Sequence, residues 1–344
     1  MDEEDKEFEL ACYEYKYLQQ HPDNNNNNKQ KITINQILKD NWDTYQFYHK
    51  SELRDVEIKE VEKTITCQDN SRGYMVQVCP NCGEIRIVHF GCNSRLCTHC
   101  GKKYTDKWAK DLANKTFDVK HRHVTFTIPD TLRPFFEDWK MLKLLMDVAI
   151  KVVKDVIKWN MGKEITPGLI VILHTYGKDI KHNPYLHCLL TEGGFKPDGT
   201  WVYIGIFPYK MLRKSWQYKL LTTLKTRIEK SDENSRLIDR LFKAHPDGFY
   251  VRAKDTINNK KNLISYLGRY IRHPAIAECR IISYDGKEIQ FYYDDEEDGK
   301  RHYVTMSVDD FITALLRHIP DKQFKTIRYS ESIIEGRKDS SKGC

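Results

Sequence analysis

The sequence predicts an α+β fold in which helices pack on an antiparallel sheet, with a small cysteine-rich module ahead of it. Three observations lead to this fold class. Short apolar or alternating segments, typical of strands, are interspersed with longer segments of helical periodicity. Two neighbouring strand segments are joined by a short loop, which is typical of an antiparallel hairpin. Six of the ten cysteines lie between residues 67 and 100 of the 344-residue chain.

Composition and charge narrow the class of protein. Hydrophobic residues make up 40% of the chain and charged residues 31%, which allows a normal buried core in two domains. The net charge of +7 permits a polyanionic partner without requiring one. No segment approaches the roughly 20 apolar residues that span a bilayer, and the first residues are acidic, unlike a secretory signal. We therefore expect a cytoplasmic protein without a membrane partner, in which clustered cysteines are reduced and indicate a metal site.

The elements of the first third of the chain follow from local patterns. Residues 1–60 form a helical and low-complexity segment, with a short predicted helix at 7–20, a run of asparagines at 24–28 and a helical pattern at 32–55. The cysteine-rich segment comes next and leads into a predicted helix at 102–118.

The residues up to 329 supply the predicted sheet and its helices. A strand at 121–129 alternates apolar residues with threonine and stops at a proline. A long amphipathic helix follows at 135–161. Two strands, 169–176 and 185–191, then form the hairpin. Further strands are predicted at 201–207, 249–254, 279–283, 288–293 and 302–307, and further helices at 209–229, 236–244, 262–271 and 308–318.

Two Cys-x-x-Cys-Gly knuckles, separated by 14 residues, form the strongest motif in the chain. Each knuckle allows two thiolates to reach one tetrahedral ion, and the glycine relieves crowding in the turn. The segments before and between the knuckles alternate as the strands of a zinc ribbon do. We therefore predict a structural Zn²⁺ bound by Cys79, Cys82, Cys97 and Cys100. Cys67 and Cys92 lie nearby, and either could replace a knuckle ligand, although the interpretation that we favour is a free thiol beside the site.

The hairpin carries a second candidate metal site. Tyr185 and His187 point to one face of their strand because strand periodicity is two. If the loop closes symmetrically about residues 180 and 181, His174 in the preceding strand lies opposite His187. Directly paired residues have Cβ atoms roughly 4.5–5.5 Å apart, which is close enough to share an ion. His187, His174 and Tyr185 are therefore the candidate ligands of a catalytic divalent metal.

Two tyrosines on the predicted helix at 262–271 are candidate nucleophiles. Tyr266 and Tyr270 are four residues apart, so their hydroxyls project from one face of a helix, although core tyrosines also show this spacing. Basic residues nearby could bind the phosphates of a nucleic acid. They are Lys254, Lys260, Lys261, Arg269 and Arg272.

These motifs, taken in order, resemble those of the two-tyrosine transposases of rolling-circle insertion sequences. This family belongs to the superfamily named for a His-hydrophobic-His (HUH) metal motif. The resemblance runs from about residue 67 to residue 329 and includes the cysteine cluster. The matching segments are 123–129, 173–177, 183–188, 266–270, 318–320 and 324–329. It implies a zinc-binding domain at 61–118 and an HUH-type nuclease core at 119–329, whereas the tail at 330–344 looks unlike the family and is expected to be disordered.

The resemblance also implies an activity. Tyr266 or Tyr270 would attack single-stranded DNA at the ends of an insertion sequence, giving a 5′-phosphotyrosine and a free 3′-hydroxyl. Mg²⁺ or Mn²⁺ would assist, and a homodimer is one candidate assembly. Two other classes stay open, a zinc-ribbon DNA-binding protein with impaired catalysis and a nickase of replication initiation or plasmid mobilisation.

One residue departs from the family pattern. The family has a histidine where this chain has Tyr185, so only His187 remains of the metal pair. A phenol with an ordinary pKa of about 10 is a poor ligand for Mg²⁺ or Mn²⁺. Either His174 or His182 therefore supplies the missing nitrogen, or the site binds the metal weakly.

Overall fold

The main sheet of the molecule is antiparallel at each of its described pairings. The computed structural model describes residues 32–116, 118–204, 208–257, 259, 262–265, 268, 274–295 and 298–330. The strand order is β11-β4-β5-β3-β7, and β6 pairs with β5. The bounds are β3 (His121–Phe126), β4 (Thr166–Tyr176), β5 (His182–Phe195), β6 (Trp201–Tyr203), β7 (Val251–Ile257) and β11 (Ile327–Ser330). The expected α+β class with an antiparallel sheet is confirmed.

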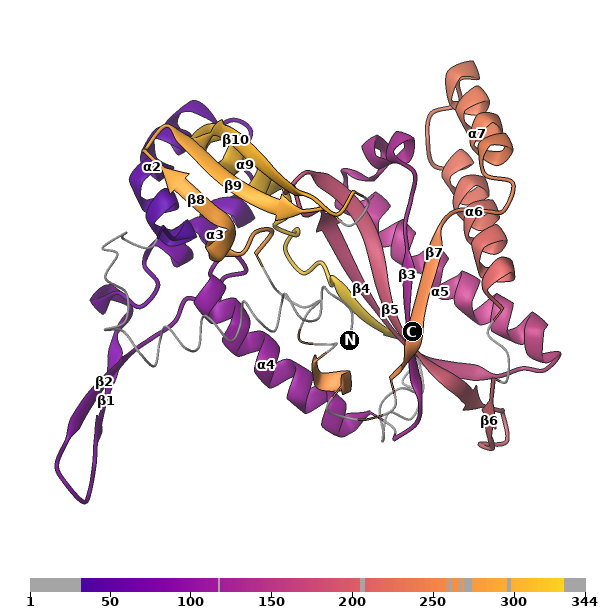
Figure 1. Ribbon diagram of the computed structural model, residues 1–344, viewed down its shortest axis with the longest axis horizontal. Coiled ribbons are helices and arrows are strands. Elements are labelled where there is room, and N and C mark those ends of the chain that lie inside the picture. The colour runs from indigo at the N-terminus through magenta and orange to yellow at the C-terminus, as the bar shows by residue number, and fades with distance from the viewer. Residues whose placement is uncertain are drawn as a thin grey trace.

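Helices α5 (Trp139–Met161) and α6 (Tyr209–Lys225) cover one face of this sheet, and α7 (Asp232–Ala244) packs beside α6 (Figure 1). Their apolar stripes are buried against alternate strand residues such as Val171 and Cys188. The helix expected from residue 135 begins at Trp139, because the side chain of Asp138 caps it by accepting the Lys140 amide. A short 3₁₀-helix, η3 (Asp130–Phe136), precedes it.

The opposite face of the sheet is covered by α4 (Thr98–Lys115) and by the segment at residues 262–265. Ala109, Leu112 and Ala113 of α4 pack against Ile170 and Ile172 of β4. Leu263 is buried in the same cluster, and Ile264 packs against it. The opposite end of α4 leads back to the cysteine-rich module, so this helix connects that module to the sheet (Figure 1).

A second core joins two parts of the chain that are far apart in sequence. Helices α2 (Ile34–Tyr48) and α3 (Asp55–Ile65) pack with α9 (Val308–Arg317) and with the small sheet β8 (Ile281–Tyr284), β9 (Glu288–Asp294) and β10 (Arg301–Ser307) (Figure 1). The Tyr45 hydroxyl lies 2.8 Å from the Thr313 hydroxyl across this core. The helical N-terminal segment and the C-terminal strands therefore form one unit, which local patterns did not predict. Short 3₁₀-helices occur at η2 (Asn70–Arg72) and η4 (Glu278–Arg280).

The predicted ribbon strands are present as a two-stranded hairpin of β1 (Tyr74–Val78) and β2 (Ile85–His89). This hairpin extends away from the rest of the molecule (Figure 1), and every residue of β1 is exposed. Within the described part of the chain, no helix has the length and apolar character needed to cross a bilayer.

Candidate catalytic and metal-binding sites

Four cysteines converge beside the start of α4. The Sγ atoms of Cys67, Cys92, Cys97 and Cys100 all lie within 4.8 Å of one another. Cys67 Sγ is 3.6 Å from Cys100 Sγ and 3.5 Å from Cys97 Sγ. Tetrahedral thiolates bound to zinc at about 2.3 Å would lie about 3.8 Å apart. The four residues therefore fit a structural Zn²⁺ site with little movement.

This cluster corrects the predicted ligand set. Cys97 and Cys100 are members as expected, but Cys79 and Cys82 lie at the tip of the β1-β2 hairpin and do not belong to it. Cys67 and Cys92 complete it instead, so the alternative in which these cysteines replace knuckle ligands fits the structure. The spacing of the knuckles gave no indication of this, because Cys67 reaches the cluster only through the packing of α3.

Local backbone geometry allows the four thiols to meet. A Cβ atom on Gly91 would lie 2.7 Å from Cys100 Sγ, so a glycine is required next to Cys92. The Cys100 amide donates to Cys97 Sγ at 3.5 Å. Hydrogen bonds from Cys92 and from this amide lower the pKa of Cys97 to about 5, whereas burial raises the pKa of Cys67 to about 11. A bound cation would favour the thiolate form of all four.

The register of the β4–β5 hairpin differs from the predicted one. His174 pairs with Tyr185, and His187 pairs with Ile172. The expected pairing of His174 with His187 is therefore wrong by two residues. The turn closes between Gly177 and Lys181, joined by a 3.0 Å hydrogen bond, and the register then shifts before His174. A displacement by two residues leaves every side chain on its expected face, so His174 remains beside His187 with ring centroids 4.8 Å apart.

A second histidine beside His187 comes from β3 and was not among the predicted site residues. His123 Nε2 lies 2.9 Å from His187 Nδ1, and both side chains are buried. The Thr125 hydroxyl lies 3.0 Å from the same His123 nitrogen. Residues 121, 123 and 125 share one face of β3, and histidines at alternate positions of a largely apolar strand were the available signal.

Tyr185 contacts the histidines of this sheet face through His174. Its hydroxyl lies 3.2 Å from His174 Nδ1, and its ring centroid is 5.0 Å from that of His187. His182, the other expected nitrogen donor, is directed elsewhere, since its Nε2 lies 3.2 Å from the carbonyl oxygen of Phe136. Of the two alternatives His174 and His182, only His174 therefore lies beside His187.

The four cysteines form a full set of metal ligands, whereas the histidines do not. Among the described residues, the groups of three or more potential ligands whose donor atoms all lie within 4.8 Å are the four cysteines and the group Asp295, Asp298 and His302. His123 and His187 form a close pair through their ring nitrogens, and His174 lies beside His187 with ring centroids 4.8 Å apart. A pair of imidazoles leaves several positions of an octahedral ion open for phosphate oxygens and water.

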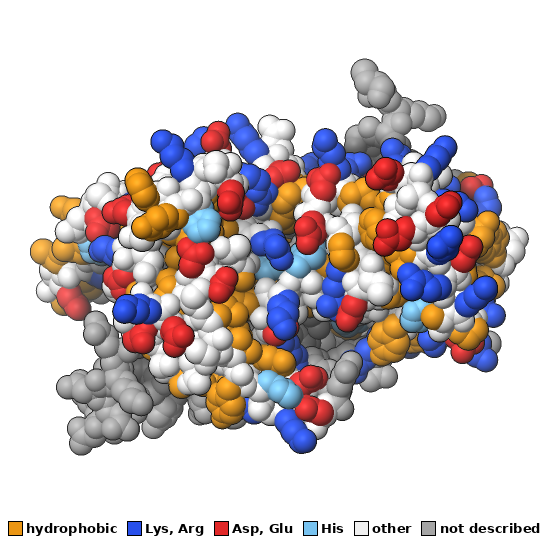
Figure 2. Space-filling view, turned by 90° about the horizontal axis from the view of Figure 1, so that it is seen from above, with side chains coloured by type: hydrophobic (Ala, Val, Ile, Leu, Met, Phe, Trp, Pro, Cys, Tyr) orange, Lys and Arg blue, Asp and Glu red, His pale blue; other side chains and the backbone are white. Residues whose placement is uncertain are grey.

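The predicted nucleophiles Tyr266 and Tyr270 lie outside the described residues, as do four of the predicted DNA-binding residues, Lys260, Lys261, Arg269 and Arg272. Lys254 lies in β7, next to β3. Leu263 and Ile264 pack on the sheet face that carries His123, His174 and His187. On the molecular face in Figure 2, basic and acidic side chains are interspersed, and histidine side chains are visible near its middle.

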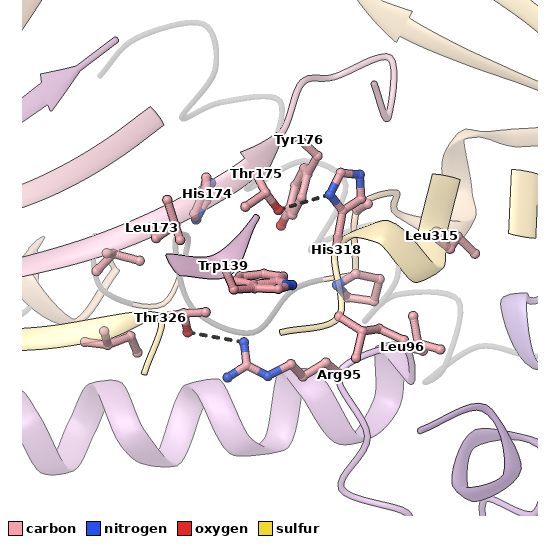
Figure 3. Close-up of a pocket in the computed structure, with 15 residues that line it drawn as sticks. Arg95, Leu96, Trp139, Leu173, His174, Thr175, Tyr176, Leu315, His318 and Thr326 are labelled. Atoms are coloured by element: carbon pink, nitrogen blue, oxygen red, sulfur yellow. Dashed lines mark hydrogen bonds between the residues drawn. The ribbon is translucent and has the colours of Figure 1, made fainter. Parts of the chain in front are cut away.

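A small cavity lies beside the sheet face that carries His123, His174 and His187, here called the histidine face. Three parts of the chain meet at this cavity (Figure 3). Its volume is about 60 Å³, enough for a few water molecules. Arg95, from the loop between the cluster cysteines, donates to the Thr326 hydroxyl at 3.2 Å. His174 lines the cavity from β4, and His318 lines it from the end of α9. The cavity therefore connects the cysteine module, the sheet and the second core.

The burial of His318 predicts that the free energy of unfolding depends on pH. Its Nδ1 lies 3.0 Å from the Thr175 hydroxyl and its Nε2 3.1 Å from the Ile180 carbonyl, and burial lowers its pKa from 6.5 to about 4. The unfolded chain therefore binds a proton between these pH values while the folded chain does not. We expect the free energy of unfolding to fall by about 2 kcal/mol from pH 7 to pH 5 through this residue.

Urea unfolding at pH 7 and pH 5, compared between the wild type and His318→Gln, would measure the contribution of His318 to this change in unfolding free energy. Glutamine can keep a donor toward Ile180 but cannot titrate, so the variant should lose less stability on acidification. An identical pH dependence in both proteins would show that His318 does not cause it. His182, whose pKa burial also lowers, and Arg317 are the neighbouring groups that act on His318, and both remain in the variant.

Comparison with known proteins gives matches to both halves of the chain. Residues 37–128 match the family described as "Transposase zinc-binding domain", and residues 168–335 match the family described as "Putative transposase". The chain is 28% identical over 296 residues to the "Transposase for insertion sequence element IS801" of Pseudomonas savastanoi pv. phaseolicola, covering 80% of this chain and 70% of that protein. It is also 28% identical over 286 residues to "Putative transposase y4qJ" of Sinorhizobium fredii (strain NBRC 101917 / NGR234), covering 76% and 71%. No solved structure matches the chain.

Proposed function

Since this chain matches a transposase family and carries a transposase zinc-binding domain, we propose that it is an insertion-sequence transposase of the HUH type, which cleaves and rejoins single-stranded DNA through a tyrosine-linked intermediate. The substrate would be the ends of its own insertion sequence. The observation that carries this proposal is the close pair His123 and His187 on the sheet face where the residues preceding Tyr266 pack.

The chemistry divides between the histidines and the tyrosines. His123 and His187 would hold a divalent cation, which when bound neutralises the charge that develops on the scissile phosphate. Imidazole ligands favour Mn²⁺ over Mg²⁺ at such a site. A hydroxyl of Tyr266 or Tyr270 would attack phosphorus while the bond to the 3′ oxygen breaks. The resulting 5′-phosphotyrosine keeps the phosphodiester energy, so a 3′-hydroxyl can later reverse the step without ATP.

Tyr185 would act on His174 rather than on the ion. Its hydroxyl is 3.2 Å from His174 Nδ1, which fixes the ring orientation of that histidine. A neutral phenol contributes little as a metal ligand. The contact with His174 gives Tyr185 a role in the site that does not require it to bind the ion. In this proposal His123 and His187 would hold the ion, and Tyr185, at the position of the family histidine, would orient His174.

The test is a cleavage assay with the full-length protein and labelled single-stranded DNA from both sides of its own coding region. With Mn²⁺ we expect a covalent protein–DNA adduct that survives denaturation, and a peptide digest should locate the DNA on Tyr266 or Tyr270. If DNA is bound but no adduct forms with Mn²⁺ or Mg²⁺, the chain is a DNA-binding protein without strand-transfer activity, and the proposal fails.

Replacing His187 with alanine is expected to reduce adduct formation by about 10² to 10³-fold, because one ligand of the cation is lost. His123→Ala should have a similar effect, since the two nitrogens are 2.9 Å apart. Initial rates at several Mn²⁺ concentrations would measure it, and part of the loss should be recovered at high Mn²⁺.

His182→Ala is the matched control for this prediction. His182 also lies in β5 but contacts the Phe136 carbonyl on another side, so we expect adduct formation within a few-fold of the wild type. Thermal unfolding of each variant would exclude a general loss of structure. Equal activity of His187→Ala and the wild type would contradict the assigned role.

A further inference from the structure

The β1-β2 hairpin exposes apolar side chains that have no covering element in the fold described above. Large hydrophobic residues on both strands are about half exposed or more. They are Tyr74, Met75, Val76, Val78, Ile85 and Ile87. An isolated two-stranded hairpin is marginally stable in water, and an exposed apolar surface commonly marks an interaction site. The hairpin therefore has the character of a surface that is buried in an assembly.

The tip of this hairpin is folded as a metal-binding knuckle. The Cys79 amide donates to the Glu84 carbonyl and the Gly83 amide donates to the Cys79 carbonyl, both at 2.9 Å. Gly83 has a φ of +71°, which a glycine adopts without strain. The Cys79 sulfur accepts hydrogen bonds from the backbone amides of Asn81 and Cys82. The same kind of amide-to-sulfur contact joins Cys100 to Cys97 in the four-cysteine cluster.

Cys79 and Cys82 supply only two ligands, whereas a structural zinc ion binds four. Among the described residues, neither cysteine belongs to a group of three or more ligands. Five paired residues separate the tip from the base of the hairpin, a distance of about 17 Å, so the four-cysteine cluster at the base is out of reach. The knuckle is thus half of a tetrahedral site, presented at the end of a projecting arm.

We propose that two copies of this chain join their hairpin tips through one shared Zn²⁺, bound by Cys79 and Cys82 of each copy. A second copy supplies the two missing thiolates with the same geometry, as the two-fold symmetry of a homodimer requires. The apolar strands beside each tip become covered when the two hairpins pack together. Binding replaces the four thiol protons by one cation, so no oxidant is involved. This assembly is independent of the strand-transfer chemistry.

The test measures zinc content and mass of the full-length protein in a reducing buffer. We expect a dimer with about 1.5 zinc ions per chain, one in each four-cysteine cluster and one shared between copies. The double variant Cys79→Ser, Cys82→Ser should be a monomer with about 1.0 zinc ion per chain and an unchanged far-UV circular dichroism spectrum. Cys279→Ser, which removes an exposed cysteine from elsewhere, should behave as the wild type.

Several outcomes would overturn the proposal. A wild-type monomer with about 1.0 or about 2.0 zinc ions per chain would show that the knuckle is empty or is completed within one chain. Loss of the shared ion in the variant Cys12→Ser, Cys344→Ser would show that the remaining ligands come from this chain's own terminal segments. A dimer that persists in the knuckle variant would show that zinc does not join the copies. None of these readouts uses DNA, so they are unaffected if the proposed nuclease activity fails.

Discussion

The double variant Tyr266→Phe, Tyr270→Phe is expected to form no covalent protein–DNA adduct and to lose at least about 10⁴-fold of the strand-cleavage rate. Phenylalanine keeps the ring and its packing but lacks the oxygen that attacks phosphorus. The remaining histidines could still bind a cation and the DNA, so binding should persist while cleavage is lost. Denaturing gels of labelled single-stranded DNA incubated with Mn²⁺ would measure the adduct directly.

The single variants separate the roles of the two tyrosines. If each tyrosine holds one strand in turn, either single variant should still form an adduct but should fail to rejoin two strands. Tyr218→Phe is the control, because Tyr218 is an exposed tyrosine on α6, away from the histidine face, and its loss should leave the rate unchanged. A full adduct signal in the double variant would exclude both residues as nucleophiles.

The second large effect is expected at the four-cysteine cluster. Cys67→Ser or Cys92→Ser should remove about one zinc ion per chain and unfold the module, because structural zinc in comparable small sites contributes about 10–16 kcal/mol to folding. Cys67 follows α3 and Cys97 caps the start of α4, so the loss should loosen the connection between the second core and the sheet. Zinc analysis and thermal unfolding monitored by circular dichroism would measure both consequences.

The contrast between cysteines makes this prediction specific. Cys79→Ser should leave the four-cysteine ion in place and should not unfold the module, since Cys79 lies at the hairpin tip. If instead Cys79→Ser unfolds the module while Cys67→Ser does not, the ligand set expected from the two knuckles would be the correct one. The same set of variants therefore distinguishes the two assignments.

The cysteine and histidine sites show which structural features local sequence patterns can predict. The knuckles, the hairpin strands and the apolar stripes were predictable because each depends on residues a few positions apart, such as Cys97 and Cys100. The face of each strand residue was also predictable, since alternation is local. Tyr185 and His187 therefore lie on the expected face, although the pairing across the hairpin was wrong by two residues.

What only the tertiary structure decided involves contacts between distant segments. The pairing of β3 with β5 brings His123 to His187. No local spacing encodes this pairing. The choice of Cys67 over Cys79 likewise depends on where α3 packs.

The sequence by itself determined the fold class, the presence of a zinc-binding module and the transposase family, because periodicity and motif order are properties of the chain alone. The tertiary structure decided which cysteines and histidines meet, and it joined α2 and α3 to α9 in a core that spans the ends of the described chain. The physical reason is that burial and strand pairing select partners by their position in space. Residues separated by hundreds of positions gain contact energy only after the intervening chain has folded.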